Sequence, residues 1–394
     1  MSWGRARRIA TAAAGPRPAV EAALTEAIGC RLAADVRALA PIPSYDVVAA
    51  DGFAVSGPGP WLGVERATAV PDGRAVPVMQ GEALPVGATA VLPYHEAVER
   101  KGSDGSWIYV GDRRRDEPDR RPGHLEPGSH VISRGSDAPA GATLAAAGSL
   151  VTPAVVAAAA ESGADLMVVV RPPDVAVITV GDDRWDHGGS RDGRRRDATT
   201  PMILTAVIRA GGRCQPVREI PGHAGHLRTP VQAALDDAAA DLVLITGPAG
   251  EAARGDVAHA LSQLRATPLV AAVAMAAGAD SLLAELPDGR LVAYVPGDLA
   301  GAVCALVTIV LPILRVMGGH PEPPSRSALL SQALPGAADR TTLVAASHTR
   351  GELADSVAPT TGPDVAAFSA ADVLIVVPSS GAPAGALVEL VDLP

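Results

Sequence analysis

The chain has 394 residues, of which 43 are acidic and 33 are basic, so its formal net charge at pH 7 is −10. This balance argues against non-specific binding to nucleic acid or to an anionic membrane surface, although it is compatible with a local basic pocket. The length is sufficient for about two to four domains with hydrophobic cores of their own.

The positions of the cysteines and the length of the apolar runs indicate the cell compartment in which the protein is found. Cys30, Cys214 and Cys304 lie far apart and form no Cys-x-x-Cys pair, which predicts buried thiols in a reducing environment rather than a disulfide framework or a zinc site. The alanine-rich start is too short and too weakly apolar for a secretory signal. The apolar run from Ala302 to Leu314 has the length of a core helix, whereas a membrane span needs about 20 residues. We therefore expect a cytoplasmic protein without membrane contact.

The first part of the chain predicts a helical segment interrupted by a β-rich one. Residues 7–40 read as one helical run with a short strand between Glu21 and Val36, ended by two prolines at Pro41 and Pro43. Residues 41–122 show short apolar runs between Gly and Pro turns, which is typical of a small β-rich domain.

The helical pattern returns after residue 122. Thr152, Pro153 and Gly163 supply the cap, first turn and stop of a predicted helix. If this segment packs with the first one, residues 7–40 and 123–170 form a helical linker or dimerisation domain, and residues 41–122 form a domain inserted into it. The mixed charges from Asp112 to Arg121 indicate an exposed loop.

Strands and helices alternate from Pro173 onward. Short connections between them predict a mostly parallel sheet covered by helices on both faces, a three-layer α/β/α domain at residues 171–318. Residues 319–394 begin with prolines and continue as short strands, which favours a small, closed, barrel-like β domain. The predicted elements of the α/β part are strands at Asp174–Val180, Cys214–Glu219 and Leu242–Thr246, and helices at Thr200–Ala210, Leu227–Ala240 and Asp256–Leu264.

A conspicuous motif runs from Pro41 to Val55. It ends in Asp51 and Gly52, which place a carboxylate on a sharp turn where the missing side chain lets another backbone or a ligand approach. An ordinary Asp-Gly turn between two strands explains the pair equally well.

Three strand ends in the α/β part carry acids or glycines. The first strand ends at Gly181, Asp182 and Asp183. The second leads through Thr246 and Gly247 into a glycine-bearing loop with Arg254, Gly255 and Asp256, where a helix is expected to begin; backbone N–H groups of such a loop can cradle an anion. The third ends in the turn Pro296-Gly297-Asp298. Turn formation and helix capping by aspartate explain the first and third ends as well.

Taken in order, these motifs resemble the MoeA-type molybdenum insertases, the molybdopterin molybdenumtransferase family. The family's opening motif has an aromatic-Asp pair and an Asp-Gly-aromatic-Ala group, matched here by Tyr45-Asp46 and by Asp51 to Ala54. Its Gly-Glu-Asp pattern is similar to Gly135-Ser-Asp137, and its Leu-Pro-Gly-Asn-Pro turn is similar to the run from Val295 to Leu299. The resemblance covers nearly the whole chain and implies a multi-domain α/β fold.

The departures from the family pattern concern the ligand-binding loops. Gln80 replaces a threonine, and Asp183 replaces a glutamate. The loop from Gly247 to Asp256 has lost a glycine and a serine. A lysine-bearing turn expected before the penultimate strand is replaced by the run from Ala274 to Asp280.

The resemblance implies insertion of molybdate into adenylylated molybdopterin with release of AMP, supported by Mg²⁺. It also implies a homodimer with a shared active cleft, with a molybdopterin-adenylylating protein and molybdoenzymes as possible partners. Carried over by motif, the implied catalytic residues are Asp51, Asp137, Asp183 and Asp256, with Asp183 and Asp256 as metal ligands. The implied cofactor-binding residues are Gly181, Asp182, Thr246, Gly247, Gly255, Pro296, Gly297 and Asp298. Because Lys101 is the one lysine of the chain, Arg134 and Arg254 are further candidates for anion contacts.

Two other functions stay open. Because the altered loop, Gln80 and the missing lysine weaken the site, a catalytically impaired relative that binds molybdopterin or molybdenum cofactor as a carrier or partner subunit is the first alternative. An unrelated sugar- or nucleotide-binding α/β protein is the second, and it would have to explain the motif from Pro41 to Val55 by chance.

Overall fold

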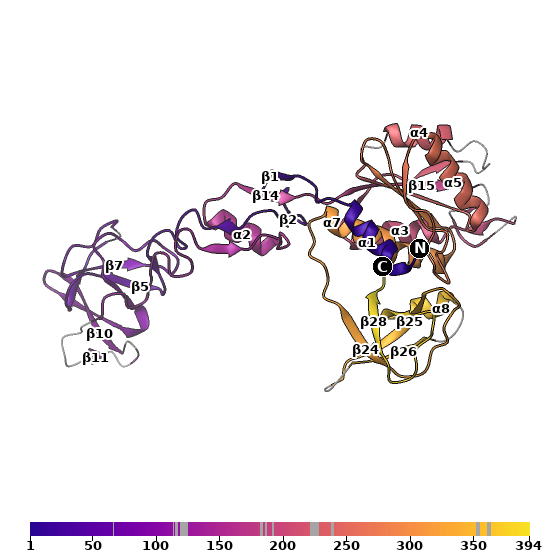
Figure 1. Cartoon of the computed structure of the whole chain (residues 1–394). Coiled ribbons are helices and arrows are strands. Elements are labelled where there is room, and N and C mark those ends of the chain that lie inside the picture. The colour runs from indigo at the N-terminus through magenta and orange to yellow at the C-terminus, as the bar shows by residue number, and fades with distance from the viewer. Residues whose placement is uncertain are drawn as a thin grey trace. The chain divides into compact units, whose positions relative to one another are not determined.

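The structure is a computed structural model of the chain, and it divides into two compact units (Figure 1). The first unit comprises residues 1–20, 29–33 and 169–394, and the second comprises residues 21–28 and 34–168. The domain boundaries expected from the sequence stay a prediction. The structure describes residues 1–65, 67–112, 114, 117–118, 125–181, 184–185, 187–190, 193–220, 228–237, 240–351, 355–360 and 364–394.

A seven-stranded sheet organises the first unit. Its strands are β15 (Asp174–Val180), β18 (Arg213–Cys214), β19 (Arg218–Ile220), β20 (Leu242–Gly247), β21 (Thr267–Val270), β22 (Leu282–Glu285) and β23 (Leu291–Pro296). The order is β18-β15-β20-β23-β22-β21, and β19 also pairs with β15. β18, β19, β15, β20 and β23 are parallel, whereas β22 and β21 form an antiparallel edge.

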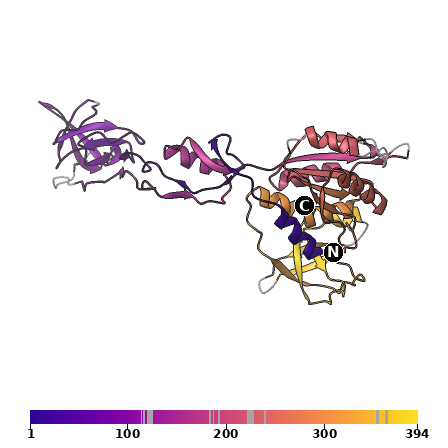
Figure 2. The ribbon, with the colours of Figure 1, turned by 45° about the horizontal axis from the view of Figure 1, so that its top comes forward.

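Helices cover both faces of this sheet (Figure 2). Successive residues of a strand point to opposite faces, so Leu242 and Leu244 pack into one core, whereas Val243 and Ile245 pack into the other. The first core includes residues of α1, α3, α6 and α7, and the second includes residues of α4 and α5. The predicted three-layer α/β fold is therefore confirmed. The helices are α1 (Trp3–Ala13), α3 (Thr199–Arg209), α4 (Arg228–Asp237), α5 (Glu251–Gln263), α6 (Leu299–Ala305) and α7 (Leu311–Met317).

α6 and α7 are joined by a π-helical segment, Leu306–Val310, into one apolar helix from Leu299 to Met317. Within the described residues this helix has the length and composition of a membrane span, but 72% of its most apolar window is buried inside the protein. The side-chain N–H of Trp3 in α1 donates to the hydroxyl of Thr308 at 3.1 Å. The prediction of a core helix from Ala302 to Leu314 is confirmed.

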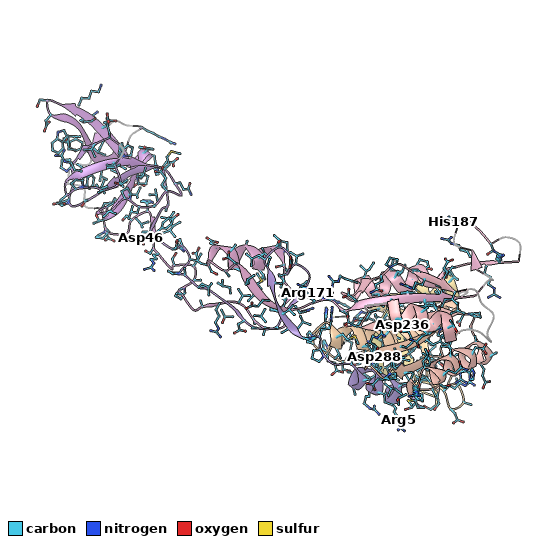
Figure 3. All side chains as sticks on the ribbon, turned by 90° about the horizontal axis from the view of Figure 1, so that it is seen from above. Arg5, Asp46, Arg171, His187, Asp236 and Asp288 are labelled. Carbon is cyan, nitrogen blue, oxygen red and sulfur yellow. The ribbon has the colours of Figure 1, made fainter. Side chains whose placement is uncertain are left out.

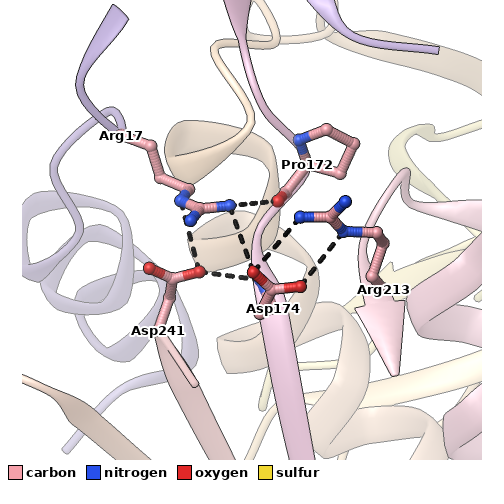
Figure 4. A network of polar contacts seen from close by, with 5 residues as sticks. All are labelled: Arg17, Pro172, Asp174, Arg213 and Asp241. Carbon is pink, nitrogen blue, oxygen red and sulfur yellow. Dashed lines mark hydrogen bonds and ion pairs between the residues drawn. The ribbon is translucent and has the colours of Figure 1, made fainter. Parts of the chain in front are cut away.

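Strand β15 is anchored at its amino end by a network of ion pairs (Figure 4). Arg17 lies 3.5 Å from the carboxylate of Asp174 and 3.3 Å from that of Asp241. Arg213 donates to both carboxylate oxygens of Asp174, at 3.1 and 3.3 Å. The backbone N–H of Asp174 donates to Asp241 at 2.7 Å, so both carboxylates are stabilised on the side of the sheet opposite the predicted ligand edge.

The C-terminal part of the first unit forms a closed five-stranded barrel in the order β24-β26-β25-β27-β28. Its core contains Leu330, Val357, Ile375 and Leu390. The predicted closed β domain is confirmed. Its elements are β24 (Arg326–Leu330), β25 (Thr342–Thr349), β26 (Ser356–Pro359), α8 (Asp364–Ser369), β27 (Val373–Val377) and β28 (Leu387–Asp392).

The second unit is mostly β structure. One sheet has the order β11-β10-β6-β7-β5-β8, with β9 beside β10; its strands are β5 (Gly52–Val55), β6 (Trp61–Gly63), β7 (Arg74–Val78), β8 (Ala90–Pro93), β9 (Ala97–Gly102), β10 (Gly105–Asp112) and β11 (Glu117–Pro118). The strands expected within residues 41–122 are confirmed. Most of the predicted loop from Asp112 to Arg121 lies outside the described residues.

The helix predicted for residues 7–40 is wrong beyond α1, whereas the strand expected between Glu21 and Val36 is present in part. α1 ends at Ala13, and the chain continues as β1 (Ala19–Ala23), β2 (Arg31–Leu32) and β3 (Val36–Arg37). The expected helical pattern at residues 123–163 is confirmed only for α2 (Pro153–Glu161), capped by the Thr152 hydroxyl; the rest contributes β12 (Val131–Ile132) and β13 (Thr143–Ala145). These strands pair with distant ones, β12 with β4 (Val47–Val48), β13 with β3, and β2 with β14 (Leu166–Val170), so tertiary pairing overrides the helical propensity of the alanines.

We expect Gly52→Ala to destabilise the second unit by about 1–3 kcal/mol, as overpacked sites typically do. Gly52 begins β5, where it lies opposite Pro93 of β8, and a Cβ atom there would lie 2.1 Å from the carbonyl oxygen of Leu92. Thermal unfolding of the variant measures the effect. Gly15→Ala is the matched control because nothing lies within 4 Å of a Cβ atom at that position. An unchanged melting temperature for Gly52→Ala would show that the strand pair is not this close.

Candidate functional site

The carboxyl ends of the parallel strands lie at one edge of the sheet, and three long segments leave it as helices. β20 leads into α5, β23 leads into α6, and α3 is tied to the end of β23 because the hydroxyl of Thr199 donates to the carbonyl of Gly297 at 3.0 Å. Ligands of parallel α/β sheets bind at this edge. It brings together Gly181, Thr246, Gly247, Pro296, Gly297 and Asp298 of the predicted site residues.

Two of the three helices carry carboxylate caps. Asp298 accepts a hydrogen bond from the N–H of Gly301 at 2.7 Å, so the predicted cap of α6 is confirmed. Asp197 accepts from the N–H groups of Thr199 and Thr200, both at 3.1 Å, and from the Thr200 hydroxyl at 2.6 Å. First-turn N–H groups of both helices, those of Thr199 and Thr200 in α3 and of Gly301 in α6, are therefore already bound to protein carboxylates, which use the positive end of each helix dipole.

α5 differs from them because its amino end has no side-chain cap. Its first residue, Glu251, follows Gly250, which has a φ of +114° that suits glycine. The N–H groups of the first turn of an α-helix have no partner within the helix, so an uncapped end presents several donors and a partial positive charge. This end of α5 can therefore bind an anion at the carboxyl edge.

The start of α5 corrects the prediction of a helix beginning near Asp256. The loop after β20 contains residues 248–250 alone, and both Gly255 and Asp256 lie inside α5. Glu251, two alanines and Arg254 are adequate helix formers, so the helix extends back toward the sheet edge. Gly255 is thus no part of an anion-binding loop, whereas Gly247 and Gly250 are.

The ends of the strands supply a second polar group, the hydroxyl of a threonine. Thr246, at the end of β20, is fully buried, and its hydroxyl has no hydrogen-bond partner among the described residues. The next residue, Gly247, packs so closely that a Cβ atom there would lie 3.1 Å from the carbonyl oxygen of Val180. Tyr294 of β23 donates its hydroxyl hydrogen bond to the carbonyl of Pro248, which fixes the loop between β20 and α5.

Arg254 and Asp256 have different surroundings within α5. Arg254 donates to the carbonyl of Ala271 at 3.0 Å and lies 3.6 Å from Glu251 and 3.9 Å from Asp280, so it braces the helix against the chain after β21. Asp256 is half-buried and has no hydrogen-bond partner among the described residues. Arg254 is therefore a poor candidate for an anion contact, whereas the carboxylate of Asp256 is available.

The predicted metal site is described only in part. Asp182 and Asp183 lie outside the described residues, and the described ones contain no group of three side chains that could hold a metal ion. Asp197 and Asp298 act as helix caps, so Asp256 is the remaining predicted metal ligand among the described residues. Mg²⁺ often takes one or two protein carboxylates beside substrate phosphates and water, so the available carboxylate of Asp256 is compatible with it.

The remaining candidates lie in the second unit. Asp51 is exposed, and its carboxylate accepts a hydrogen bond from the N–H of Gln80 at 2.7 Å. Arg134 and Asp137 are exposed on a segment that pairs with residues 42–48: the N–H of Arg134 donates to Asp46 at 2.7 Å, and that of Asp137 donates to the carbonyl of Ile42 at 3.0 Å. Figure 3 marks Asp46 in this unit.

The residues that precede α3 were not predicted from the sequence. Asp197, Thr199 and Thr200 form its cap and tie it to Gly297, and Arg194 to Arg196 are exposed just before them. An aspartate two residues before threonines and a proline, after a basic run, is a helix-start signal that was present in the sequence. These arginines give the start of α3 a local positive charge within an acidic protein.

The thiols show no sign of reactivity. Cys30 and Cys304 are buried and Cys214 is half-buried, and none of the three forms a disulfide. Burial raises the pKa of Cys304 to about 12, and it also raises the pKa of Cys214. Neutral, desolvated thiols are poor nucleophiles and poor metal ligands, so we assign them to packing.

Gly255→Ala is expected to stabilise the protein by about 0.5–1 kcal/mol because glycine costs this much inside a helix. Gly255 is exposed within α5, and nothing lies within 4 Å of a Cβ atom there. A higher melting temperature with unchanged activity is the expected result. Lost activity in a stable variant would instead show that a ligand approaches the backbone at this position.

Two family descriptions match the chain, one over its first part and one over the α/β part. The MoeA N-terminal region (domains I and II) matches residues 1–163, and the probable molybdopterin binding domain matches residues 176–316. The chain belongs to the MoeA-type family. The second match spans the sheet and the helices whose edge is described above.

Curated relatives agree with this assignment, and a solved structure has the same fold. The chain is 29% identical over 338 residues to "Molybdopterin molybdenumtransferase 2" of Mycobacterium tuberculosis (strain ATCC 25618 / H37Rv), covering 79% of this chain and 78% of the relative. It is 27% identical over 353 residues to molybdopterin molybdenumtransferase 1 of the same strain, covering 81% and 78%. The molybdopterin biosynthesis MoeA protein from Pyrococcus horikosii has the same fold, with a TM-score of 0.76 at 20% identity over 99% of this chain and 98% of that one. The expected family, fold and transferase class are thereby confirmed.

Proposed function

We propose that this protein is a molybdenum insertase of molybdenum cofactor biosynthesis, which transfers molybdate to adenylylated molybdopterin and releases AMP. The observation that carries the proposal is the uncapped start of α5 beside the buried, unpartnered hydroxyl of Thr246 at the carboxyl edge of the sheet. Family membership and relatives named molybdopterin molybdenumtransferase support it.

The residues of this edge suit a phosphorylated ligand. N–H groups at the start of α5 would donate to phosphate or molybdate oxygens, and the Thr246 hydroxyl would donate once a ligand oxygen reaches it. Gly247 and Gly250 let an anion approach the backbone, which a Cβ atom at either position would hinder. The arginines at 194–196 would raise the local concentration of anionic substrate.

One observation supports a role for Mg²⁺: the carboxylate of Asp256 is available to bind a metal ion. Asp256, with Asp183, would hold the ion; when bound, Mg²⁺ neutralises phosphate charge as AMP leaves. The chain's own contribution is then to orient the phosphates at α5 and to keep the leaving phosphate in a positive environment.

The second unit would supply Asp51, Asp137 and Arg134. In the proposed cytoplasmic homodimer they would act on the active cleft of the other subunit. A molybdopterin-adenylylating protein would deliver the substrate, and molybdoenzymes would accept the product.

A carrier of molybdopterin or molybdenum cofactor is the second candidate function. It is favoured by the engagement of Arg254 with Asp280 and Ala271, because this removes one cation from the edge. The run from Ala274 to Asp280 has no lysine, so it cannot replace that cation.

Reconstitution of an apoenzyme tests the proposal. Purified protein, adenylylated molybdopterin, Mg²⁺ and molybdate are incubated with a molybdenum-free molybdoenzyme, and its activity and the released AMP are measured. Reconstitution above the control without protein, with AMP in equal amount, is the expected result. Ligand binding without either signal would instead establish the carrier.

A further inference from the structure

A large cleft lies within the first unit, away from the carboxyl edge of the sheet. Its volume is ≈ 1220 Å³, and it is bounded by α1, by the last turn of α3, by the helical segment from Val307 to Arg315 and by the chain from Glu389 to Pro394. Because α3 starts at the carboxyl edge and contributes its last residues here, the cleft is distinct from the candidate active site. The volume is sufficient for an organic ligand.

The cleft combines an apolar wall with a cluster of arginines. This combination suits a ligand that has an apolar body and an anionic head. The apolar residues include Trp3, Val307, Leu311, Pro312, Val391 and Leu393, and the cationic ones are Arg7, Arg8, Arg209, Arg315 and Arg326.

Protein groups engage two of these arginines. Arg326 forms an ion pair with Asp392 at 2.5 Å, and Arg209 donates to the C-terminal residue Pro394 at 3.2 Å. The acidic residues that also line the cleft are Glu322, Asp372, Glu389 and Asp392, and all four are exposed. Asp372 accepts a hydrogen bond from the N–H of His348 at 3.1 Å.

Arg7 is the least satisfied of the arginines. One of its terminal nitrogens, Nη1, is buried and has no hydrogen-bond partner among the described residues. Its guanidinium lies over the ring of Trp3, 5.6 Å from the centroid. A buried N–H donor without a partner costs free energy, and an anion in the cleft would remove this cost.

Arg315 brings a second positive charge close to Arg7. Burial lowers the pKa of Arg315, and the charge of Arg7 lowers it further, whereas Asp392 and Glu322 act in the opposite direction. His320 also lines the cleft. Burial and the charges of Arg31 and Arg315 lower the pKa of its imidazole, so this side chain is mainly neutral at pH 7. Arg7 and Arg315 thus carry two half-buried positive charges that repel each other, and the acidic residues of the cleft are exposed.

We propose that this cleft binds a small organic anion, whose phosphate or carboxylate group is held by Arg7 and Arg315 and whose apolar body packs against Trp3 and Leu311. Guanidinium groups bind both head groups through paired, charge-assisted hydrogen bonds. The site is independent of molybdate insertion.

Calorimetric titration with phenyl phosphate, benzoate and inorganic phosphate tests this site. We expect the wild-type protein to bind at least one of the two aromatic anions more tightly than inorganic phosphate, and the stronger one identifies the head group. Arg7→Gln and Arg315→Gln should each weaken that binding about tenfold or more, the worth of one charge-assisted contact. Arg5→Gln is the matched control: Arg5 is exposed on the same helix (Figure 3) and does not line the cleft.

A second measurement locates the ligand. Quenching of tryptophan fluorescence by the bound anion should disappear in Trp3→Phe. Arg7→Gln should keep or raise the melting temperature, because it removes an unpaired buried donor. The proposal would be overturned if neither aromatic anion bound at a concentration of about 10 mM, because the binding free energy would then be weaker than about 3 kcal/mol. Inorganic phosphate that binds as tightly as both aromatic anions, or equal weakening in Arg5→Gln, would also overturn it.

Discussion

Asp51→Ala is expected to lower the rate of molybdate insertion by about a hundredfold or more, the usual effect of removing a group that takes part in proton transfer. The fold should persist because Asp51 is exposed and its carboxylate accepts one exposed hydrogen bond, from the N–H of Gln80. Such a bond contributes about 1 kcal/mol, so the melting temperature should fall by a few degrees at most. The reconstitution assay and thermal unfolding measure the two effects.

Asp51→Asn distinguishes chemistry from loop positioning. Asparagine keeps the oxygen that accepts from Gln80 but removes the charge, so it should be as inactive as alanine if the carboxylate acts on the substrate. Glu65→Ala, at another exposed acid of the same unit, should leave activity unchanged. Full activity of Asp51→Asn would show that Asp51 only holds the loop that carries Gln80.

Asp256→Asn is expected to reduce insertion by about a hundredfold as well, because it removes the available carboxylate of α5 that would hold Mg²⁺. Stability should change by no more than a few tenths of a kcal/mol, since Asp256 has no hydrogen-bond partner among the described residues and loses only its interaction with the helix dipole. Insertion rates over a range of Mg²⁺ concentrations measure the effect on activity.

Metal affinity is measured separately with Mn²⁺ by electron paramagnetic resonance. Asp256→Asn should weaken Mn²⁺ binding, whereas Glu285→Gln, at an exposed acid of β22, should not. Wild-type Mn²⁺ affinity together with lost insertion would assign Asp256 to substrate positioning. An insertion rate of Asp256→Asn equal to that of the wild-type protein would show that Asp256 is not part of the active site.

The order of elements in the α/β part was predictable because each local pattern agrees with the tertiary context. β15, β20 and β23 are continuous apolar runs buried on both faces, and such runs between helical patterns indicate a parallel sheet. The cap of α6 by Asp298 was equally local: an aspartate after a Pro-Gly turn and before an apolar helix.

Residues 14–37 were predictable only in part: a strand was expected between Glu21 and Val36, but the separate strands β1, β2 and β3 were not. Their alanines favour a helix, yet β2 and β3 form because β14 and β13, more than a hundred residues later, provide strand partners. The start of α5 was misplaced for a related reason. Gly255 signals a helix boundary locally, but it is accommodated inside α5, which is fixed against the sheet by Val257 and Leu261.

The sequence by itself determined the family, the three-layer α/β fold and the closed C-terminal β domain, because periodicity and turn residues act over a few positions. It also placed Asp51 and the ends of β20 and β23 correctly at turns. Only the tertiary structure decided which helix ends remain open to a ligand, since this depends on which carboxylates reach the first-turn N–H groups. It alone brought Arg7 beside Arg315 and the last residues of the chain, because a cleft between distant segments leaves no periodic signal in the sequence.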